Sequence, residues 1–258
     1  MCLVAFQYRS VPGYPLILAA NRDEFFDRPT ESLEVREDGT IYCGLDQRAG
    51  GTWLGANRRG LFAGVTYFRS GMKQEVAGRS RGLLVMDYLR SSPNAKAFAR
   101  ESSFTAHEYG PFNFLWGDGD NLFYYTNRGE DGVVSVAPGV HAQSNGLLDA
   151  PWPKARRAKA ALQELAAAPG PPDAEDYFAL LADETGAPDR ELPDTGIGLR
   201  GERFLAPIFI RGDGAYGTRS SSVLFIREDR VAFFYERRFD AGGKVLENSG
   251  FEFSMKAD

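Results

Sequence analysis

Residues 1–24, MCLVAFQYRSVPGYPLILAANRDE, decide the fold of this chain. They contain two apolar runs typical of β-strands, residues 2–8 and 16–20, on either side of a Pro-Gly turn. A hairpin built from these runs returns the chain on itself, because a short turn is enough to join antiparallel strands. The hairpin is therefore expected to place residues 21–23 beside Cys2.

Cys2 combines two reactive groups if the initiator methionine is removed, because one residue then carries a thiol and the free α-amino group. An α-amino group titrates near ~7.7–8.0 and a thiol near ~8.5, so the amine is able to accept the thiol proton near neutral pH. Pairing a nucleophile with an N-terminal amine is a known variant of the catalytic triad. The chain has only two histidines, His107 and His141, which leaves few ways to build a histidine-dependent triad or metal site. We therefore expect Cys2 to supply nucleophile and base, with no metal centre and no required cofactor.

The composition is typical of a globular protein: of 258 residues, 43% are apolar and 25% are charged, and the formal net charge is −5. This length suits one β-rich domain, and we expect residues 1–258 to form a single domain. Arginines lie beside acidic residues, so no basic stripe indicates a nucleic-acid partner. No run approaches the ~18 apolar residues of a membrane span, and the start of the chain lacks the features of a secretory signal. We therefore expect a cytoplasmic protein with reduced cysteines and no integral membrane segment.

The order of the expected elements indicates the fold class. Strand patterns precede helical patterns at residues 154–168 and 173–184, and they return at residues 207–211 and between residues 220 and 237. We expect residues 185–206 to be irregular. No internal repeat and no glycine-rich nucleotide loop is present. This order predicts an α+β fold in which helices pack outside antiparallel sheets.

Four glycines, Gly50, Gly51, Gly55 and Gly64, have two interpretations. They clear room beside a ligand, or they serve turns and a bulge. We favour the second interpretation, because glycine in strands often marks bulges.

Motifs spread over nearly the whole chain resemble the NRDE family, also called the Transport and Golgi organisation family. The family is named for the tetrad that stands here as Asn21-Arg22-Asp23-Glu24. The other matching segments are residues 1–2, 50–57, 80–82, 113–118, 144–145, 148–149, 151–154 and 216–221. Together these motifs are far more specific than the tetrad alone.

This family is similar to the N-terminal-nucleophile (Ntn) hydrolases, particularly choloylglycine hydrolase and penicillin V acylase. The resemblance implies a four-layer αββα sandwich, with two mostly antiparallel sheets between outer helices. It implies Cys2 as the nucleophile and Asp23 as the carboxylate that orients the amine of Cys2. It also implies Arg22 or Arg219 as the cation near the thiolate, and Asn145 as an oxyanion-hole donor.

The resemblance also indicates residues that line a ligand site. Relatives differ in a second oxyanion-hole residue, and Thr66 and Tyr67 occupy that neighbourhood here. We expect these two residues, with Asn21, Glu24 and Trp53, to contact the ligand.

Each assignment has a structural alternative. Cys2 in a buried strand would be a small apolar filler, and Arg22 with Asp23 would form a surface ion pair worth about 0–1 kcal/mol. Asn145 precedes a glycine, as turn asparagines often do, and Arg219 would be an ordinary charge at a strand end. His107 and His141 are expected to be structural or exposed, with ligation of haem iron as the alternative.

Two functional hypotheses follow. The first is a hydrolase that uses Cys2 against a non-peptide amide or an acyl thioester. The second follows from the resemblance, whose members are implicated in haem trafficking and in handling acyl-coenzyme A: the chain binds and transfers an amphipathic ligand such as haem or an acyl compound. Both hypotheses predict an apolar cleft with a cationic rim.

Overall fold

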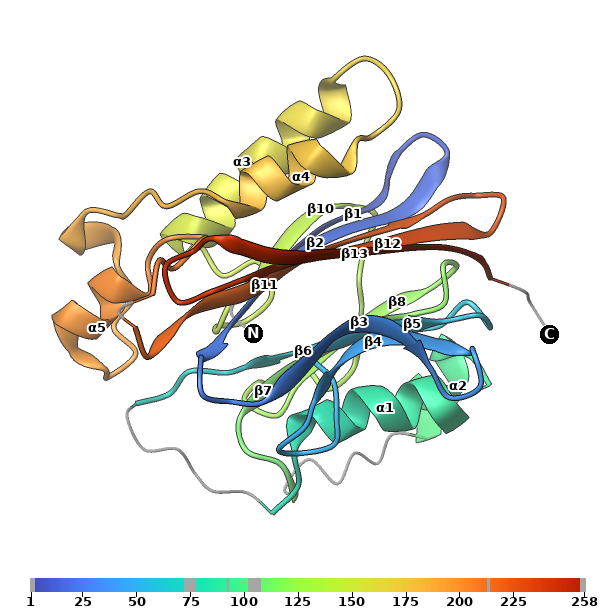
Figure 1. Ribbon diagram of the computed structural model, residues 1–258, viewed down its shortest axis with the longest axis horizontal. Helices are drawn as coiled ribbons and strands as arrows, with labels where there is room; N and C mark the ends of the chain where they lie inside the picture. Colours follow the sequence, from blue (N-terminus) through green and yellow to red (C-terminus); the bar gives the residue numbers. More distant parts are fainter. Residues whose placement is uncertain (1–2, 72–77, 92, 102–107, 213, 256–258) are drawn as a thin grey trace.

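The computed structural model describes residues 3–71, 78–91, 93–101, 108–212 and 214–255. Two antiparallel sheets lie face to face, and helices cover the outer face of each sheet (Figure 1). The layers therefore follow the order helix, sheet, sheet, helix. This arrangement confirms the predicted α+β class and the four-layer αββα sandwich.

Sheet A is built around the opening hairpin and has the strand order β10-β1-β2-β11-β12-β13. Its strands are β1 Leu3–Val11, β2 Tyr14–Phe25, β10 Gly139–Gln143, β11 Tyr216–Ile226, β12 Val231–Phe239 and β13 Val245–Ser254. Pairing of β2 with β11 joins the two ends of the sequence in one sheet.

Sheet B follows the chain order from β3 to β9. Its strands are β3 Thr30–Arg36, β4 Ile41–Asp46, β5 Leu54–Asn57, β6 Phe62–Tyr67, β7 Phe112–Gly117, β8 Leu122–Thr126 and β9 Val134–Ser135.

Four helices form the outer layers. Helices α3 (Pro153–Ala167) and α4 (Ala174–Leu181) pack on sheet A, and α1 (Arg81–Ser91) and α2 (Ala95–Glu101) pack on sheet B (Figure 1). None of the helices in the described ranges has both the length and the apolar character needed to cross a membrane.

Side-chain alternation explains why both faces of β1 are buried. Val4 and Phe6 point into the core between the sheets, whereas Leu3 and Ala5 pack with residues of α3 and α4. The apolar run at the start of the chain is uninterrupted because β1 is a central strand with a packed layer on each side.

The strand register places the described start of β1 beside the tetrad of residues 21–24. Leu3 pairs with Asn21 on β2, and Val4 pairs with Gln143 on β10. The predicted hairpin is therefore confirmed over its described residues.

Two local predictions were wrong. Helix α5 (Gly198–Phe204) and the 3-10 turn η2 (Asp189–Glu191) lie in the segment expected to be irregular. Residues 207–211 do not form a strand: the Phe209 N–H donates to Asp183 O, and Ile210 O accepts from the Thr218 N–H. This apolar segment is buried by tertiary packing, with single hydrogen bonds in place of a ladder.

Gly51 makes room for a helix. A Cβ atom on Gly51 would lie 2.4 Å from the Gly82 carbonyl carbon at the start of α1, and one on Gly55 would lie 2.8 Å from Leu89 Cδ1. These two glycines therefore serve close packing of α1 on sheet B, which neither interpretation of the glycine pattern included.

We expect Gly51→Ala to lower the free energy of unfolding by about 1–3 kcal/mol, because the clashing atoms are backbone and the helix must shift. Urea unfolding measures this change. The matched control is Gly186→Ala, since nothing lies within 4 Å of a Cβ built there. Equal stabilities of the two variants would contradict the packing argument.

Candidate functional site

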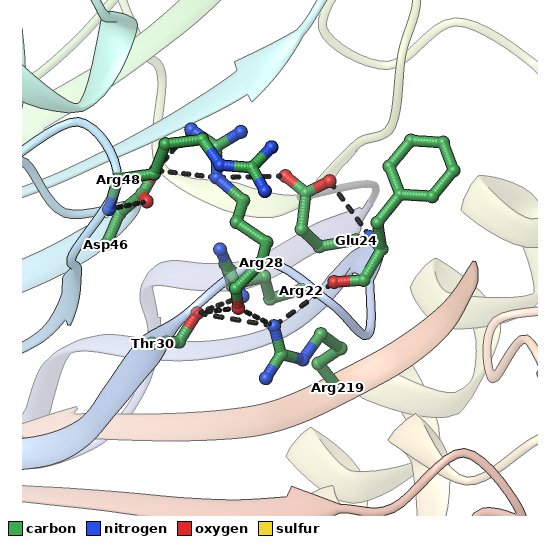
Figure 2. A network of polar contacts seen from close by, with 8 residues as sticks. Arg22, Glu24, Arg28, Thr30, Asp46, Arg48 and Arg219 are labelled. Atoms are coloured by element: carbon green, nitrogen blue, oxygen red, sulfur yellow. Dashed lines mark hydrogen bonds and ion pairs between the residues drawn. The ribbon is translucent and has the colours of Figure 1, made fainter. Parts of the chain in front are cut away.

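Arg22 lies between the two sheets, on the same side of β2 as Ala20. Its guanidinium carbon lies 4.3 Å from the ring centroid of Trp53, the residue that directly precedes β5 of the facing sheet. Its Nη1 donates to Thr30 Oγ1 at 3.2 Å (Figure 2). Burial is the largest cause lowering the pKa of Arg22 to about 10, which the Glu24 carboxylate opposes and the Arg219 cation reinforces. Arg22 is thus a desolvated cation on an aromatic face.

Trp53 forms the other wall of this region. Its ring lies where a side chain on Gly44 would be, because a Cβ on Gly44 would come within 2.3 Å of Trp53 Cη2. Trp53 is almost fully buried, so it contacts Arg22 inside the sandwich. This position suits the predicted ligand contact.

Arg219 stands at a β-bulge at the start of β11. Thr218 pairs with Asp23 and Ser220 pairs with Arg22, which leaves Arg219 without a partner in the ladder. Its Nη1 donates to Phe25 O at 3.1 Å, to Arg28 O, and to Thr30 Oγ1 at 3.4 Å (Figure 2). Burial, and then the charge of Arg238, lower the pKa of Arg219.

Glu24 lies at the edge of the same region and takes part in ion pairing. Its Oε1 accepts from the Phe25 N–H at 2.9 Å, and its Oε2 lies 3.8 Å from Arg28 Nε. Arg28 Nη2 in turn lies 2.6 Å from Asp46 Oδ2. The contacts of Glu24 are therefore local.

Asp23 points to the opposite side of β2 from Arg22, as strand alternation requires. It is 2% exposed, and its Oδ1 accepts from Thr218 Oγ1 at 2.7 Å. Its Oδ2 is buried and has no hydrogen-bond partner among the residues that the structure describes. A buried carboxylate oxygen without a partner is costly, so it indicates a group that is still to be accounted for.

Asn21 also points to the helix side, where described residues engage its amide; its expected ligand contact stays a prediction. Its Nδ2 donates to Leu181 O at 2.8 Å and to Ile208 O at 2.9 Å, and its Oδ1 accepts from Ser221 Oγ at 2.6 Å. Asn21 thus uses its polar atoms to join β2 to the end of α4 and to β11.

Asn145 lies just after β10, in the segment that leads to α3, and it contacts the end of β6 in sheet B. Its Nδ2 donates to Tyr67 O at 2.7 Å, and the preceding Ser144 O accepts from Thr66 Oγ1 at 3.1 Å. Thr66 and Tyr67 form the end of β6, so this strand end holds the turn that carries Asn145.

Thr66 belongs to a buried polar network, and its expected ligand contact stays a prediction. Its Oγ1 accepts from Gln143 Nε2 at 2.7 Å and from Asn113 Nδ2 at 3.1 Å. Asn113 Nδ2 also donates to Gly146 O at 3.0 Å. The network fixes the position of Asn145 relative to both sheets.

A buried ion pair supports the same turn. The Arg69 N–H donates to Asn145 O at 2.8 Å, and Arg69 Nη1 lies 3.4 Å from Glu202 Oε2, although these two atoms are not aligned as a hydrogen bond. Glu202 Oε1 accepts from the Thr195 N–H at 2.8 Å and from Thr195 Oγ1 at 2.6 Å. Helix α5 is thereby tied to the end of β6.

Cys2 and His107 lie outside the described residues, so their predicted roles stay predictions. His141 is described: its Nδ1 lies 2.7 Å from Asp149 Oδ2, and its Nε2 lies 2.9 Å from Ala137 O. Both ring nitrogens are engaged, which supports the structural interpretation of His141 over haem ligation.

Asp149 explains how firmly His141 is held. Burial raises the pKa of this carboxyl, but hydrogen bonds from His141, Lys159 and the Ala142 N–H outweigh burial and lower it well below its usual range. The cluster keeps Asp149 ionised between two basic side chains.

Two further polar side chains between the sheets escaped the sequence analysis. Glu236 on β12 is buried, and its Oε1 accepts from the Leu33 N–H at 2.8 Å. Burial raises the pKa of Glu236 against the effects of that N–H, of the nearby Ser220 hydroxyl, and of the Arg238 and Arg22 charges. Ser220 Oγ is also buried, and no described residue is aligned to bond it. The signal for both was a polar residue at an inward position of an alternating strand.

The predicted residues therefore fall into three groups at one end of the sandwich. Arg22, Arg219 and Trp53 meet between the sheets, and Asp23 lies on the helix side of β2. Asn145 bridges the sheets beside β10. Pairing of Leu3 with Asn21 brings the arginine group and Asp23 to the start of β1. Pairing of Val4 with Gln143 brings Asn145 there.

Comparisons with known proteins agree with this architecture. A family model described as Transport and Golgi organisation 2 matches residues 1–241. The Transport and Golgi organization 2 homolog of Mus musculus is 31% identical over 277 residues, with 100% of each chain covered. The Bos taurus homolog is 33% identical over 257 residues, with 92% of each chain covered.

A solved structure supports the fold. The Caenorhabditis elegans N-acylethanolamine-hydrolyzing acid amidase ortholog matches 86% of this chain and 92% of its own, with a TM-score of 0.51 and 13% sequence identity. At this identity the likeness concerns the fold alone. The family match, by contrast, spans nearly the whole sequence, so the chain belongs to the Transport and Golgi organisation 2 family.

Proposed function

We propose that this chain is an Ntn-type hydrolase that cleaves a non-peptide amide or an acyl thioester, with Cys2 as nucleophile. The observation that carries the proposal is Asp23 Oδ2, a buried carboxylate oxygen without a partner among the described residues. Asp23 lies two residues beyond Asn21, the partner of Leu3, and Leu3 is bonded to Cys2. An α-ammonium group from Cys2 is the cation that this oxygen requires.

The proposed reaction uses the amine as a proton carrier. The thiol proton of Cys2 passes to the α-amino group, and the sulfur electron pair forms a C–S bond to the substrate carbonyl carbon. The carbonyl π electrons move to oxygen, where the second N–H of the Asn145 amide donates to them. Such a donor contributes about 10²–10³-fold in known hydrolases.

The intermediate then collapses with release of the leaving group. The C–N bond of an amide, or the C–S bond of a thioester, breaks, and the ammonium returns its proton to the departing atom. Water hydrolyses the acyl-enzyme, which releases the acid and restores the thiol.

A second function, binding and transfer of haem or acyl-coenzyme A, is supported by a different observation. The Arg22 guanidinium lies on the face of Trp53 inside the sandwich, so a cation and an aromatic surface stand side by side. This combination suits an amphipathic ligand and does not require a nucleophile.

The test is the chemical state and reactivity of the first residues. Full-length protein is treated with iodoacetamide at pH 7.5 and analysed by intact mass and N-terminal sequencing. We expect Cys2 at the N-terminus and its alkylation at least about 100-fold faster than that of Cys43, since reactivity follows the thiolate. Cys43 is an internal reference, because it is fully buried and burial raises its pKa to about 11.

Matched variants then separate the role of Asp23 from general charge effects. Asp23→Asn is expected to slow alkylation of Cys2 about tenfold, a change of one pKa unit. Asp27→Asn removes an exposed carboxylate from the neighbouring loop and is expected to leave the rate unchanged. A retained Met1, or a Cys2 no more reactive than Cys43, would refute the hydrolase.

A further inference from the structure

Two arginines converge on one neutral hydroxyl at the end of the sandwich. Arg22 Nη1 lies 3.2 Å from Thr30 Oγ1, and Arg219 Nη1 lies 3.4 Å from the same atom (Figure 2). Thr30 Oγ1 donates its own hydrogen to Arg28 O at 3.1 Å. The hydroxyl therefore accepts from two cations and offers no charge to balance them.

Neighbouring arginines have the carboxylate partners that these two lack. Arg28 Nη2 lies 2.6 Å from Asp46 Oδ2, and Arg238 Nη1 lies 3.2 Å from Glu247 Oε2. In the described part of the chain, neither Arg22 nor Arg219 has a carboxylate oxygen within the 4.0 Å of an ion pair.

The charge imbalance is costly where the groups are dehydrated. Arg22 is 4% exposed and Arg219 is half-buried, so water does not fully screen their repulsion. Burial lowers the pKa of both guanidinium groups. A bound anion would remove the repulsion, and guanidinium groups are the side chains best shaped to hold carboxylate or phosphate oxygens.

We propose that Arg22 and Arg219, spaced by Thr30, bind the anionic carboxylate or phosphate group of a ligand, with Trp53 beside Arg22 accommodating its apolar part. This inference rests on the proposed function for the location of the ligand site, because it names the class of ligand that this site takes. It holds for a substrate and for a carried ligand alike.

The geometry also separates this site from a purely structural arginine pair. Arg219 Nη1 already bonds the carbonyl oxygens of Phe25 and Arg28, which hold the loop between β2 and β3. Those bonds account for the position of Arg219. The carboxylates of Glu24, Asp27 and Asp46 offset part of its charge from a distance, but none of them forms an ion pair with it. The buried Glu236 carboxylate lies close enough to Arg22 for their charges to interact, but it is not an ion-pair partner of either arginine. The binding experiment is done without the Cys2 thiol, which the proposed function treats as a further anion.

Binding is measured by isothermal titration on the full-length chain carrying Cys2→Ala, at constant ionic strength. The probes are inorganic phosphate, octanoate and the neutral isostere octanamide. We expect at least one of the two anions, phosphate and octanoate, to bind. If the site takes a carboxylate, octanamide should bind at least about tenfold more weakly than octanoate. The probe that binds identifies the headgroup.

Two arginine variants in the same background test the residues. Arg219→Met is expected to weaken anion binding at least about tenfold, in the range of a lost charged hydrogen bond. Arg48→Met removes an exposed arginine from the same neighbourhood and is expected to change binding less than twofold (Figure 2). Thermal unfolding without ligand verifies that each variant folds. If Arg219→Met does not fold, Arg219→Lys replaces it, with a loss of at least about threefold expected because lysine cannot bind in a fork.

The outcomes distinguish this inference from the proposed reaction. Three results would overturn the anion site. In the first, neither anion binds. In the second, the Arg219 and Arg48 variants have equal effects, and in the third, octanoate and octanamide bind equally well while phosphate does not bind. None of these results depends on Cys2, whereas the alkylation experiment tests Cys2 alone.

Discussion

Replacing Cys2 by alanine is expected to lower turnover at least about 10³-fold while leaving ligand affinity within about twofold. Loss of a covalent nucleophile costs up to about 10⁶-fold in well-studied hydrolases, because the chemical step then lacks its attacking group. Binding should persist, since Arg22 and Trp53 make their contacts without Cys2. Steady-state kinetics with a p-nitroanilide and a thioester of the same medium-chain acid measure the first quantity, and titration of the acid measures the second.

The control for this experiment is Cys43→Ala. Cys43 lies on β4 among the side chains that pack sheet B against α1, at the opposite face from Arg22 and Trp53. Its removal should leave turnover unchanged. Turnover that survives in Cys2→Ala would exclude the nucleophile role, and a wild-type chain that binds but converts neither substrate would favour the carrier function.

Arg69→Met is expected to lower the free energy of unfolding by about 3–5 kcal/mol, as measured by urea denaturation. The side chains of Arg69 and Glu202 are only 6% and 4% exposed, so methionine would leave a buried carboxylate without its counter-charge. Thr195 donates two hydrogen bonds to Glu202 Oε1 and keeps that carboxylate in place, which prevents it from turning to solvent.

The matched control, Arg203, lies on α5 next to Glu202. Arg203 Nη2 pairs with Asp189 Oδ2 at 2.5 Å, but these side chains are 57% and 50% exposed. Water screens an exposed ion pair and ordering two long side chains costs entropy, so Arg203→Met should have little effect. A loss in Arg69→Met as small as that in Arg203→Met would show that the buried pair does not stabilise the fold.

Arg69 also has a consequence for the site. Its N–H holds the carbonyl of Asn145, the proposed oxyanion donor. The helix α5 segment, which the sequence analysis expected to be irregular, is therefore connected to the turn on which the reaction depends. Regions that look unstructured in sequence can carry such supports, because their contacts are to distant segments.

The local part of the candidate site was predictable from the tetrad and the hairpin. Alternation along β2 places Arg22 and Asp23 on opposite faces, and pairing of Leu3 with Asn21 brings the tetrad to the start of β1. The sequence did not reveal that Asn21 and Thr66 are buried supports whose hydrogen bonds go to distant backbone and side-chain atoms.

By itself, the amino-acid sequence determined the elements of this protein: an apolar opening hairpin buried on both faces, strands with period-two alternation and helices that cover them. These features arise from interactions among near neighbours in the chain, so local patterns reveal them. Only the tertiary structure decided that a bulge directs Arg219 to Thr30, that Arg69 meets Glu202, and that one oxygen of Asp23 has no hydrogen-bond partner among the described residues. Each of these contacts depends on the register between segments far apart in sequence, and no local pattern predicts which side chains will meet. Burial then determines how strongly the charged side chains interact.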